Sequence, residues 1–204
     1  MNFEIETASY KDAKDLAEIY AHYVKNTAVT FEYDVPTSEE FALRINNTLC
    51  KYPFIKAKAD GKTVGFAYAS SFHSREAYQF SAEISVYMHH MYRGSGGGRL
   101  LYSNLEQLLY AQHVTNLYAC IACTEREDKY LTDASIRFHE RMGYRSVGRL
   151  RNCGYKFGAW YDIVYMEKIC FPRKVPAEKF ISFPDLRRTA GAEKNTCADK
   201  KEDI

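Results

Sequence analysis

The segment from residue 81 to residue 112 changes its pattern twice, and it restricts the fold of this chain more than any other segment. Residues 81–88 alternate between apolar and polar side chains, which predicts a strand with one buried face. The sequence Arg93-Gly94-Ser95-Gly96-Gly97-Gly98-Arg99 follows, and leucines then recur at helical spacing. A strand, a glycine-rich turn and a helix form an anion-binding arrangement, because glycines let the backbone approach a ligand and the first helical N–H groups have no partners.

The spacing of the glycines separates three kinds of anion-binding loop. A P-loop requires Gly-Lys-Ser/Thr at the helix entry, but this chain has Gly98-Arg99-Leu100. A dinucleotide fingerprint requires Gly-x-Gly-x-x-Gly, and Arg99 occupies the place of the third glycine, which makes this alternative weak without excluding it. The pattern Arg-Gly-x-Gly-x-Gly before an amphipathic helix resembles the pyrophosphate-binding motif of the GNAT acetyltransferases, where coenzyme A lies across the helix N-terminus. On this motif alone, an ordinary glycine-rich surface turn stays open as an alternative.

Composition predicts a folded, soluble chain without a strong global charge. The 204 residues suffice for one domain with an appendage, and a hydrophobic content of 46% provides for a core. The formal net charge of +2 gives no reason to expect a nucleic-acid partner or an anionic membrane surface. The N-terminus lacks the pattern of a signal peptide, and no apolar stretch reaches the length of a membrane span. We therefore expect a cytoplasmic protein.

The cysteines predict reduced thiols and no metal site. They are scattered through apparent core segments, which suits free thiols better than a disulfide framework. Cys120 and Cys123 have Cys-x-x-Cys spacing, but they lie in a segment with the pattern of a strand, where residues three apart face opposite sides. No second pair of cysteines or histidines has zinc-ligand spacing.

The remaining patterns predict an α/β chain in which most strands are antiparallel. A Thr-x-x-Glu capping box at Thr37 opens a helix, and Asp60-Gly61 predicts a tight hairpin turn. One parallel crossover is expected from the central strand, through its helix, to the next strand. Strands are expected around residues 3–5 and at 54–59, 64–69, 81–88, 117–124, 144–150 and 159–168, and helices at 11–25, after 37, after 98 and after 132.

Four motifs in this order resemble the phosphinothricin and methionine sulfoximine N-acetyltransferases of the GNAT family. They are residues 82–87, the loop 93–98, residues 134–140 with Gly143-Tyr144 after them, and residues 154–162. The resemblance covers residues 1–168 and implies the GNAT fold, a mixed, mostly antiparallel twisted sheet flanked by helices, with acetyl-CoA as co-substrate. We expect an acetyltransferase domain over residues 1–170 and a tail over residues 171–204. Residues 180–184 are a candidate docking segment, and the end of the tail is expected to be disordered.

The resemblance also implies roles in catalysis. Attack of an amine on a thioester requires removal of a proton, stabilisation of the oxyanion and return of a proton to the leaving thiolate. Glu83 is expected to be the base, and the alternative is a solvated strand carboxylate. The backbone of Val86, Tyr87 and Met88 is expected to bind the pantetheine arm. Helical spacing points His139 inward, where it is expected to protonate the thiolate, and the alternative is a satisfied core histidine.

The cofactor contacts implied by the resemblance lie in the glycine loop and at the start of the later helix. Thr132 stands where the family has an asparagine, and the preceding segment 125–131 is longer than usual, so this contact is expected to differ. The expected set is Arg93, Gly94, Ser95, Gly96, Gly97, Gly98, Arg99, Thr132 and Ser135.

For the substrate, the resemblance implies a pocket around Arg75, because a guanidinium binds a carboxylate or phosphinate through two parallel hydrogen bonds. Tyr78 belongs to the same loop, and Ser85 lies on the central strand. Phe31 either closes this pocket or packs back on its own domain. His73 stands where the family has a lysine, so the identity of the substrate does not carry over.

The sequence thus predicts an N-acetyltransferase that transfers acetyl from acetyl-CoA to the primary amine of a small amino-acid-like molecule of the phosphinothricin or methionine sulfoximine/sulfone type. The resemblance makes a homodimer an expectation. One alternative is a GNAT-fold protein that binds acyl-CoA without turnover, against which Glu83 and His139 argue. Another is an acetyltransferase for protein or polyamine amines, which would require an open or acidic groove in place of the pocket expected around Arg75.

Overall fold

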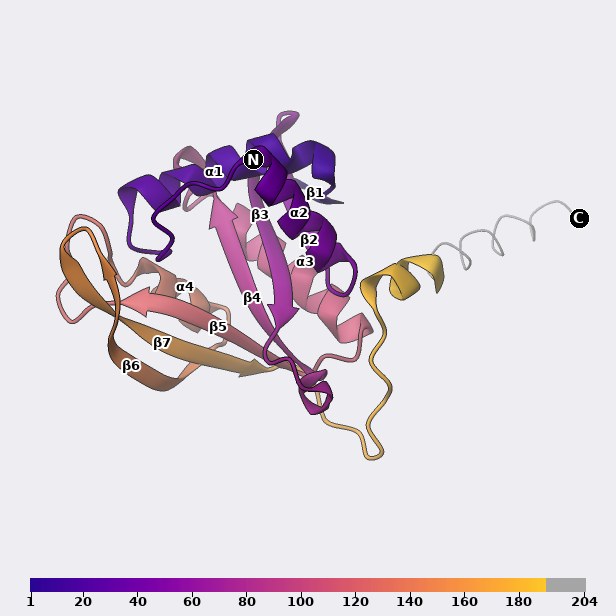
Figure 1. Cartoon of the computed structure of the whole chain (residues 1–204). Coiled ribbons are helices and arrows are strands. Elements are labelled where there is room, and N and C mark those ends of the chain that lie inside the picture. Colours follow the sequence, from indigo (N-terminus) through magenta and orange to yellow (C-terminus); the bar gives the residue numbers. More distant parts are fainter. Residues whose placement is uncertain (190–204) are drawn as a thin grey trace, which may run out of the picture.

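A computed structural model of the chain describes residues 1–189 and contains one seven-stranded sheet flanked by helices (Figure 1). The spatial order of the strands is β1-β2-β3-β4-β5-β7-β6. The strands are β1 (Glu4–Thr7), β2 (Phe54–Ala59), β3 (Lys62–Ser71), β4 (Ser81–Met88), β5 (Asn116–Cys123), β6 (Arg145–Lys156) and β7 (Ala159–Ile169). The helices are α1 (Ala13–Asn26), α2 (Ser38–Leu49), α3 (Gly97–Ala111) and α4 (Ala134–Arg141), with short 3-10 turns at Tyr10–Asp12, Glu76–Tyr78 and His90–Tyr92. The mixed, mostly antiparallel sheet predicted from the sequence is confirmed.

The strands β4 and β5 are the only parallel neighbours among the described strands, and they pair over a short distance. Ser81–Glu83 pair with Asn116–Tyr118, whereas β4 continues to Met88 and β5 to Cys123. The two strands separate beyond this point (Figure 1). The edge of β4 that faces β5 therefore has no strand partner beyond Glu83.

Helices cover both faces of the sheet, as the patterns of their sequences predict. Leu16, Tyr20 and Tyr23 of α1 are buried with Phe41 of α2 in a core over one face. The capping box is confirmed, because Thr37 Oγ1 accepts the N–H of Glu40 at 3.1 Å and the Glu40 carboxylate accepts the N–H of Thr37 at 2.8 Å. The helices α3 and α4 lie against the opposite face, where leucines of α3 pack on small and aliphatic residues of β2 to β5.

Strand β6 extends further than the sequence predicts. The predicted strand ends at residue 150, but β6 continues to Lys156 and pairs with Ala159 at the start of β7. The register shifts between Leu150 and Gly154, and Asn152 has a positive φ of 49°. Such an irregularity interrupts the two-residue alternation of a strand, so the sequence pattern ends where the bulge begins.

The tail returns to the domain and docks on it through main-chain hydrogen bonds. The N–H of Phe183 donates to the carbonyl of Lys51 at 3.0 Å, and the N–H of Ile181 donates to the carbonyl of Gln112 at 3.2 Å. The amide of Gln112 joins the two contacts, because Nε2 donates to the carbonyls of both Lys51 and Ile181 at 2.8 Å. Phe183 is 3% exposed. The disorder predicted for the end of the tail falls outside the described residues.

Within residues 1–189, no helix has the length and apolar character needed to cross a membrane.

Candidate active site

The carboxylate of Glu83 lies where β4 and β5 separate. Glu83 is the last residue of β4 to pair with β5, opposite Tyr118, and Ser70 is its partner on β3. Its side chain points away from the core formed by Ala82 and Ile84, and it is partly buried. Burial raises the pKa of this carboxyl, and the nearby imidazole of His73 acts in the opposite direction. A carboxylate with a raised pKa is a better proton acceptor than a solvated one.

Tyrosines from three elements lie on the same face of the sheet as Glu83. Tyr68 stands opposite Ser85 on β3, and the rings of Tyr20 and Tyr87 meet edge to face at 5.0 Å. Burial raises the pKa of Tyr68 and raises that of Tyr20 to about 12. These phenols therefore stay neutral near pH 7, and the hydroxyl of Tyr20 lies 2.7 Å from Oγ1 of Thr30. Sequence reasoning missed Tyr20 and Tyr68, because helical and strand periodicity mark both only as core positions.

The α1–α2 loop is held over this face from two directions. Lys156 Nζ donates to the carbonyls of Thr27 and Thr30 at 3.0 and 2.7 Å. Phe31 packs against Gly154, where an added Cβ would lie 2.1 Å from the phenyl ring. Phe31 thus packs on its own domain while it stays partly exposed, and its predicted contact with the substrate stays a prediction. Lys156 gave no recognisable signal in the sequence, because its partners are main-chain carbonyls.

The main chain of β4 offers one free position to a ligand in the gap between β4 and β5. The hydroxyl of Tyr23 donates to the carbonyl of Met88 at 2.6 Å and accepts its N–H at 3.2 Å. The N–H of His89 donates to the carbonyl of Val64 at 2.8 Å, so the main chain of Tyr87, two residues earlier, also points toward β3, where its partner is Phe66. Because N–H and C=O groups alternate between the two edges of a strand, Val86 faces the gap. Of the three residues predicted to bind the pantetheine arm through the main chain, the geometry thus leaves Val86 available.

The glycine loop enters α3 in the way the sequence predicts. Gly94 and Gly96 have positive φ values of 75° and 92°, and Gly96 is the N-cap of α3. Gly97 allows close packing, because an added Cβ would lie 2.7 Å from the Met88 side chain. The first intrahelical bond runs from the N–H of Leu100 to the carbonyl of Gly96, so the preceding N–H groups are free to bind an anion.

Arg93, Ser95 and Arg99 complete this loop. The Arg93 guanidinium lies 5.2 Å from the centre of the Tyr23 ring, the Ser95 hydroxyl donates to the carbonyl of Tyr92 at 2.6 Å, and Arg99 is exposed. A Cβ at Gly98 would lie 3.8 Å from Phe138, which places α4 beside the start of α3.

His139 is buried, and both of its ring nitrogens are engaged. His139 is 4% exposed. Its Nε2 lies 2.6 Å from the Tyr102 hydroxyl, and its Nδ1 lies 2.7 Å from the carbonyl of Ser135. Nδ1 donates to the carbonyl, so Nε2 accepts from Tyr102. Burial lowers the pKa of His139 to about 4 although the Ser135 contact acts in the opposite direction, so the ring is neutral near pH 7. The inward orientation is confirmed, but this geometry gives no support to the predicted protonation of a thiolate.

Thr132 and Ser135 lie at the start of α4. Thr132 is exposed, and its hydroxyl accepts the N–H of Ala134 at 3.4 Å. Ser135 holds the imidazole of His139 through its carbonyl. Both residues are near the helix that packs on the glycine loop, and their predicted contacts with the cofactor stay predictions.

The predicted substrate loop lies beside Glu83. Phe72 stacks on Tyr118 with ring centres 4.2 Å apart, and Tyr118 pairs with Glu83 across the sheet. His73 is exposed and its ring lies 4.9 Å from that of Tyr78. Arg75 is also exposed and precedes the 3-10 turn of Tyr78. The structure thus brings Phe72, His73 and Tyr78 of this loop to the same face as Glu83, and the predicted role of Arg75 stays a prediction.

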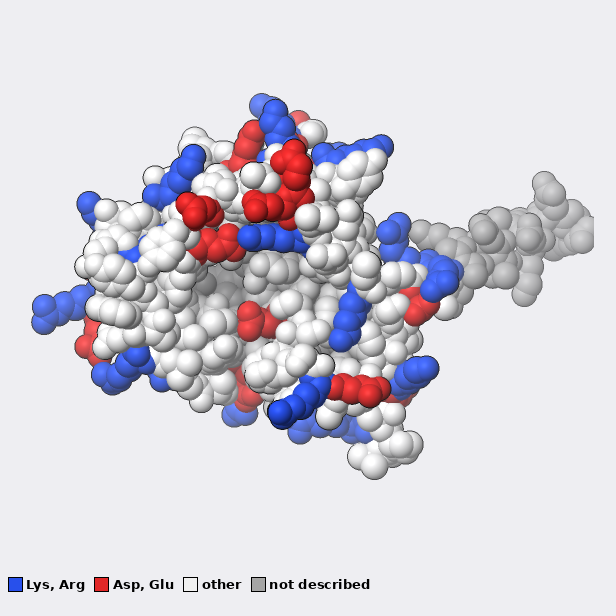
Figure 2. Space-filling view, in the orientation of Figure 1, with Lys and Arg blue, Asp and Glu red and all other residues white. Residues whose placement is uncertain are grey.

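Figure 2 shows that this face is hollowed below α1 and α2, with acidic and basic side chains around the hollow.

Cys120 lies exposed on β5 and Cys123 is buried, so the two thiols of the Cys-x-x-Cys sequence face opposite sides as predicted. Burial, followed by the Glu83 charge, raises the pKa of Cys120 to about 11, so its thiol is protonated near pH 7.

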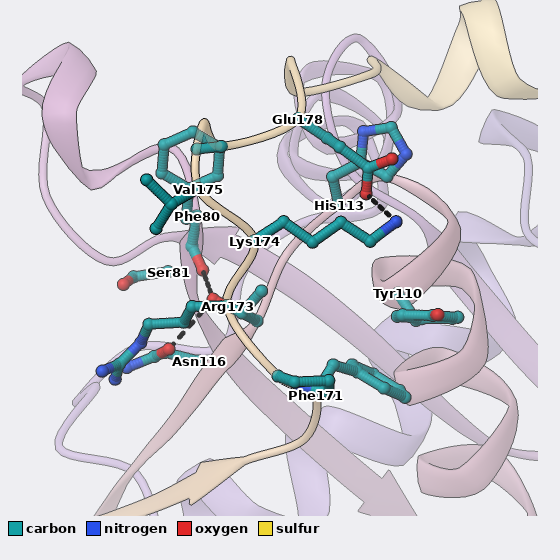
Figure 3. A pocket seen from close by; sticks show the side chains of 13 residues that line it. Phe80, Ser81, Tyr110, His113, Asn116, Phe171, Arg173, Lys174, Val175 and Glu178 are labelled. Carbon is teal, nitrogen blue, oxygen red and sulfur yellow. Dashed lines mark hydrogen bonds and ion pairs between the residues drawn. The ribbon is translucent and has the colours of Figure 1, made fainter.

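A separate cavity of about 370 Å³ lies between the tail and the starts of β4 and β5 (Figure 3). Tyr110 and Phe171 stack at 3.6 Å on one side, and Lys174 pairs with Glu178 at 2.9 Å across it. None of the residues predicted to bind cofactor or substrate lines this cavity. It is therefore distinct from the site around Glu83.

Comparison with known proteins identifies the family. Residues 5–165 match the acetyltransferase (GNAT) domain family. Phosphinothricin N-acetyltransferase of Streptomyces viridochromogenes is 31% identical over 165 residues, which cover 81% of this chain and 86% of that protein. The L-methionine sulfoximine/L-methionine sulfone acetyltransferase of Salmonella typhimurium is 30% identical over 166 residues, which cover 80% of this chain and 92% of that protein.

A solved structure extends the similarity to three dimensions. The crystal structure of a GNAT superfamily phosphinothricin acetyltransferase from Sinorhizobium meliloti in complex with acetyl-CoA superposes with a TM-score of 0.79 and 30% identity, and it covers 91% of this chain and 97% of that chain. The matched region contains the glycine loop, the separated strands and Glu83. The chain therefore belongs to the GNAT acetyltransferase family.

Proposed function

We propose that this enzyme transfers an acetyl group from acetyl-CoA to the primary amine of a small amino-acid-like substrate of the phosphinothricin or methionine sulfoximine/sulfone type. The observation that carries the proposal is the partly buried carboxylate of Glu83, at the point where β4 and β5 separate and on the strand that leads into the glycine loop. The named activities of the relatives from Streptomyces viridochromogenes and Salmonella typhimurium support the substrate class.

The residues present fit acetyl-CoA. The free N–H groups at the start of α3 suit its pyrophosphate, and the open edge of β4 at Val86 suits its amide-bearing arm. When bound, acetyl-CoA supplies an acetyl thioester that reacts with an amine. We assign the cofactor contacts to the main chain of Val86 and to the loop from Arg93 to Arg99, with Thr132 and Ser135 as further candidates.

Glu83 acts as the base in this proposal. A substrate amine is mostly protonated near pH 7, and the carboxylate accepts its first proton before or during attack on the thioester carbonyl. The new C–N bond replaces the C–S bond of the thioester, and the second proton of the amine goes, through solvent, to the departing CoA sulfur. Burial raises the pKa of Glu83 and thereby improves the match with this task. The neutral phenols of Tyr68 and Tyr20 supply polar groups on the same face without competing for the proton.

Arg75 binds the acidic group of the substrate in this proposal. It lies exposed in the loop that packs through Phe72 on Tyr118, the neighbour of Glu83. A planar guanidinium suits a carboxylate or phosphinate, and His73 adds a second contact where the family has a lysine. Tyr78 and Ser85 border the same face.

We assign His139 a supporting role in place of the predicted acid. Its neutral imidazole joins Tyr102 of α3 to Ser135 of α4, and the two helices meet beside the glycine loop. We further propose a cytoplasmic protein that acts without a nucleic-acid or membrane partner, which the formal net charge of +2 supports. The homodimer expected from the resemblance is tested by light scattering coupled to gel filtration.

The proposal is tested by release of free CoA from acetyl-CoA in the presence of different amines. Phosphinothricin, methionine sulfone and methionine sulfoximine should each release CoA faster than spermidine or a peptide with a free N-terminus. Faster turnover of spermidine or the peptide would instead favour an acetyltransferase for polyamine or protein amines. Binding of acetyl-CoA without release by any amine would favour a non-catalytic binding protein.

A further inference from the structure

Three histidines from two parts of the chain stack beside the glycine loop. The rings of His22 on α1 and His90 after β4 are nearly parallel, at an angle of 17°, with centres 4.7 Å apart. The ring of His89 also stacks on that of His90, with centres 4.4 Å apart and an angle of 27° between the rings. We call His22, His89 and His90 the histidine stack. Two residues separate its last member from Arg93, the first residue of the glycine loop.

The surroundings of the histidine stack are cationic. Burial, and then the charges of His90, Arg93 and His89, lower the pKa of His22. Burial and then His90 lower the pKa of His89. No acidic group contributes to either shift, and within residues 1–189 no carboxylate forms an ion pair with the histidine stack or with Arg93. Groups that gain positive charge on acidification thus face one another without a counter-ion.

The hydrogen bonds of the rings leave donors available. The Nδ1 atom of His89 accepts the N–H of Met91 at 3.3 Å, so Nε2 carries the proton of the neutral ring. Nδ1 of His22 lies 3.5 Å from the Asn26 amide, which leaves Nε2 free in the same way. His90 is exposed to solvent. The stack therefore presents N–H groups near the start of α3, where the free backbone N–H groups favour an anion.

We infer that the histidine stack and Arg93 form a phosphate-binding subsite for acetyl-CoA that takes up protons when the cofactor binds. The inference rests on the proposed function, because the glycine loop adjoining Arg93 is the proposed pyrophosphate site. A phosphate group relieves the repulsion among the imidazolium groups and Arg93. The charged groups that act on His22 and His89 are His89, His90 and Arg93, and none of them is negatively charged.

The sign of the pH dependence follows from this arrangement. A bound phosphate favours the charged imidazoles, so the pKa values of His22 and His89 are higher in the complex than in the free protein. The histidines then contribute fully to cofactor affinity at pH values below their pKa in the free protein, which for His22 lies below the ordinary 6.5. This contribution is lost as pH rises through their pKa in the complex. Each proton taken up changes the dissociation constant by up to about tenfold per pH unit within that window.

The test measures acetyl-CoA binding by calorimetry, at constant ionic strength, for the wild type and the double variant His22→Asn/His90→Asn. We expect the variant to bind about 5- to 10-fold more weakly at about pH 6 and within about twofold of the wild type at about pH 8.5. In buffers of different ionisation enthalpy, the wild type should take up more protons than the variant. His113→Asn is the matched control, because His113 lies at the distant tail contact, where its Nδ1 meets the carbonyl of Lys179 at 2.6 Å.

A comparison with acetyl-dephospho-CoA identifies which phosphate is bound. Loss of the difference between wild type and variant with this ligand assigns the subsite to the 3′-phosphate, and its persistence assigns the subsite to the pyrophosphate; either result supports the subsite. Dissociation constants of wild type and double variant that run in parallel from low to high pH would overturn the inference while leaving the proposed function intact. No binding of acetyl-CoA by any of the proteins would overturn the proposed function itself.

Discussion

At the scale of single residues, the account depends most on Glu83. Replacement by glutamine keeps the shape of the side chain and removes the base, so we expect kcat to fall about 10²- to 10⁴-fold while the KM for acetyl-CoA stays within about twofold. Steady-state kinetics measure both constants. Glu4→Gln, at an exposed position of β1, is the matched control and should behave as the wild type. An equal loss in turnover and in cofactor affinity would remove Glu83 as the base.

The pH profile gives an independent measure of the same group. Because the base must be deprotonated, kcat/KM should fall as pH decreases through the raised pKa of Glu83, with a midpoint above the ordinary value of 4.5. The residual activity of Glu83→Gln should lack this acidic limb. An unchanged limb in the variant would assign the titration to another group.

A supporting role for His139 makes a different prediction. In His139→Asn, the buried hydroxyl of Tyr102 loses its acceptor, which costs about 1–3 kcal/mol of stability. The melting temperature should fall by about 2–4 °C for each kcal/mol, while kcat of the folded enzyme stays within about threefold. Tyr102→Phe removes the same bond from the other side and should lower stability in the same way. A fall in kcat of about 100-fold without loss of stability would instead restore His139 as an acid.

The residues show where sequence reasoning reaches its limit. Helical spacing placed His139 inward correctly, because burial follows periodicity. It gave no information on Tyr102 and the Ser135 carbonyl, whose contacts occupy both nitrogens of the ring and depend on how α3 and α4 pack. Periodicity likewise gave no information on the hydroxyl of Tyr23, which donates a hydrogen bond to the carbonyl of Met88, 65 positions away in sequence.

At the scale of elements, the glycine loop is open to a direct test. Gly96 has a φ of 92° and nothing within 4 Å of an added Cβ, so Gly96→Glu places a carboxylate at the start of α3 without a clash. We expect it to raise the dissociation constant of acetyl-CoA at least about tenfold, because the carboxylate competes for the same N–H groups and repels phosphate.

Gly61 provides the control for this substitution. It has a φ of 76°, equally open space, and a place in the β2–β3 turn, so Gly61→Glu carries the same backbone strain. Its cofactor affinity should stay within about twofold of the wild type. Equal losses in both variants would indicate backbone strain as the cause and would argue against the loop as the binding site.

Most elements follow from local patterns, and the exceptions have a local cause. The capping box at Thr37 and the Asp60-Gly61 turn formed as predicted, because each is set by residues close in sequence. The second half of β6 was missed because a bulge near Asn152 breaks the alternation. The sequences of β4 and β5 do not predict that the two strands separate, because the separation depends on how the strands pair.

At the scale of the whole molecule, the tail links the end of the domain to α3. We retain residues 1–170 as the proposed domain and predict that Phe183→Ala releases the docked segment, because the buried ring and its neighbours hold the tail on Lys51 and Gln112. Limited trypsin digestion should then cut faster at Lys174 and Lys179. Val175→Ala changes a residue that is 96% exposed and should leave the rate unchanged. Equal rates in both variants would show that docking does not depend on Phe183.

The central claim is that the whole molecule acetylates a small amine with acetyl-CoA, and the most direct measurement identifies the product. The enzyme is incubated with acetyl-CoA and methionine sulfone, and mass spectrometry of the amine is combined with a thiol assay for free CoA. The account predicts N-acetylated methionine sulfone in a one-to-one ratio with free CoA, at a rate that Glu83→Gln reduces at least about 100-fold. The account would be contradicted if methionine sulfone stayed unmodified although the enzyme binds acetyl-CoA, or if CoA were released without an acetylated amine.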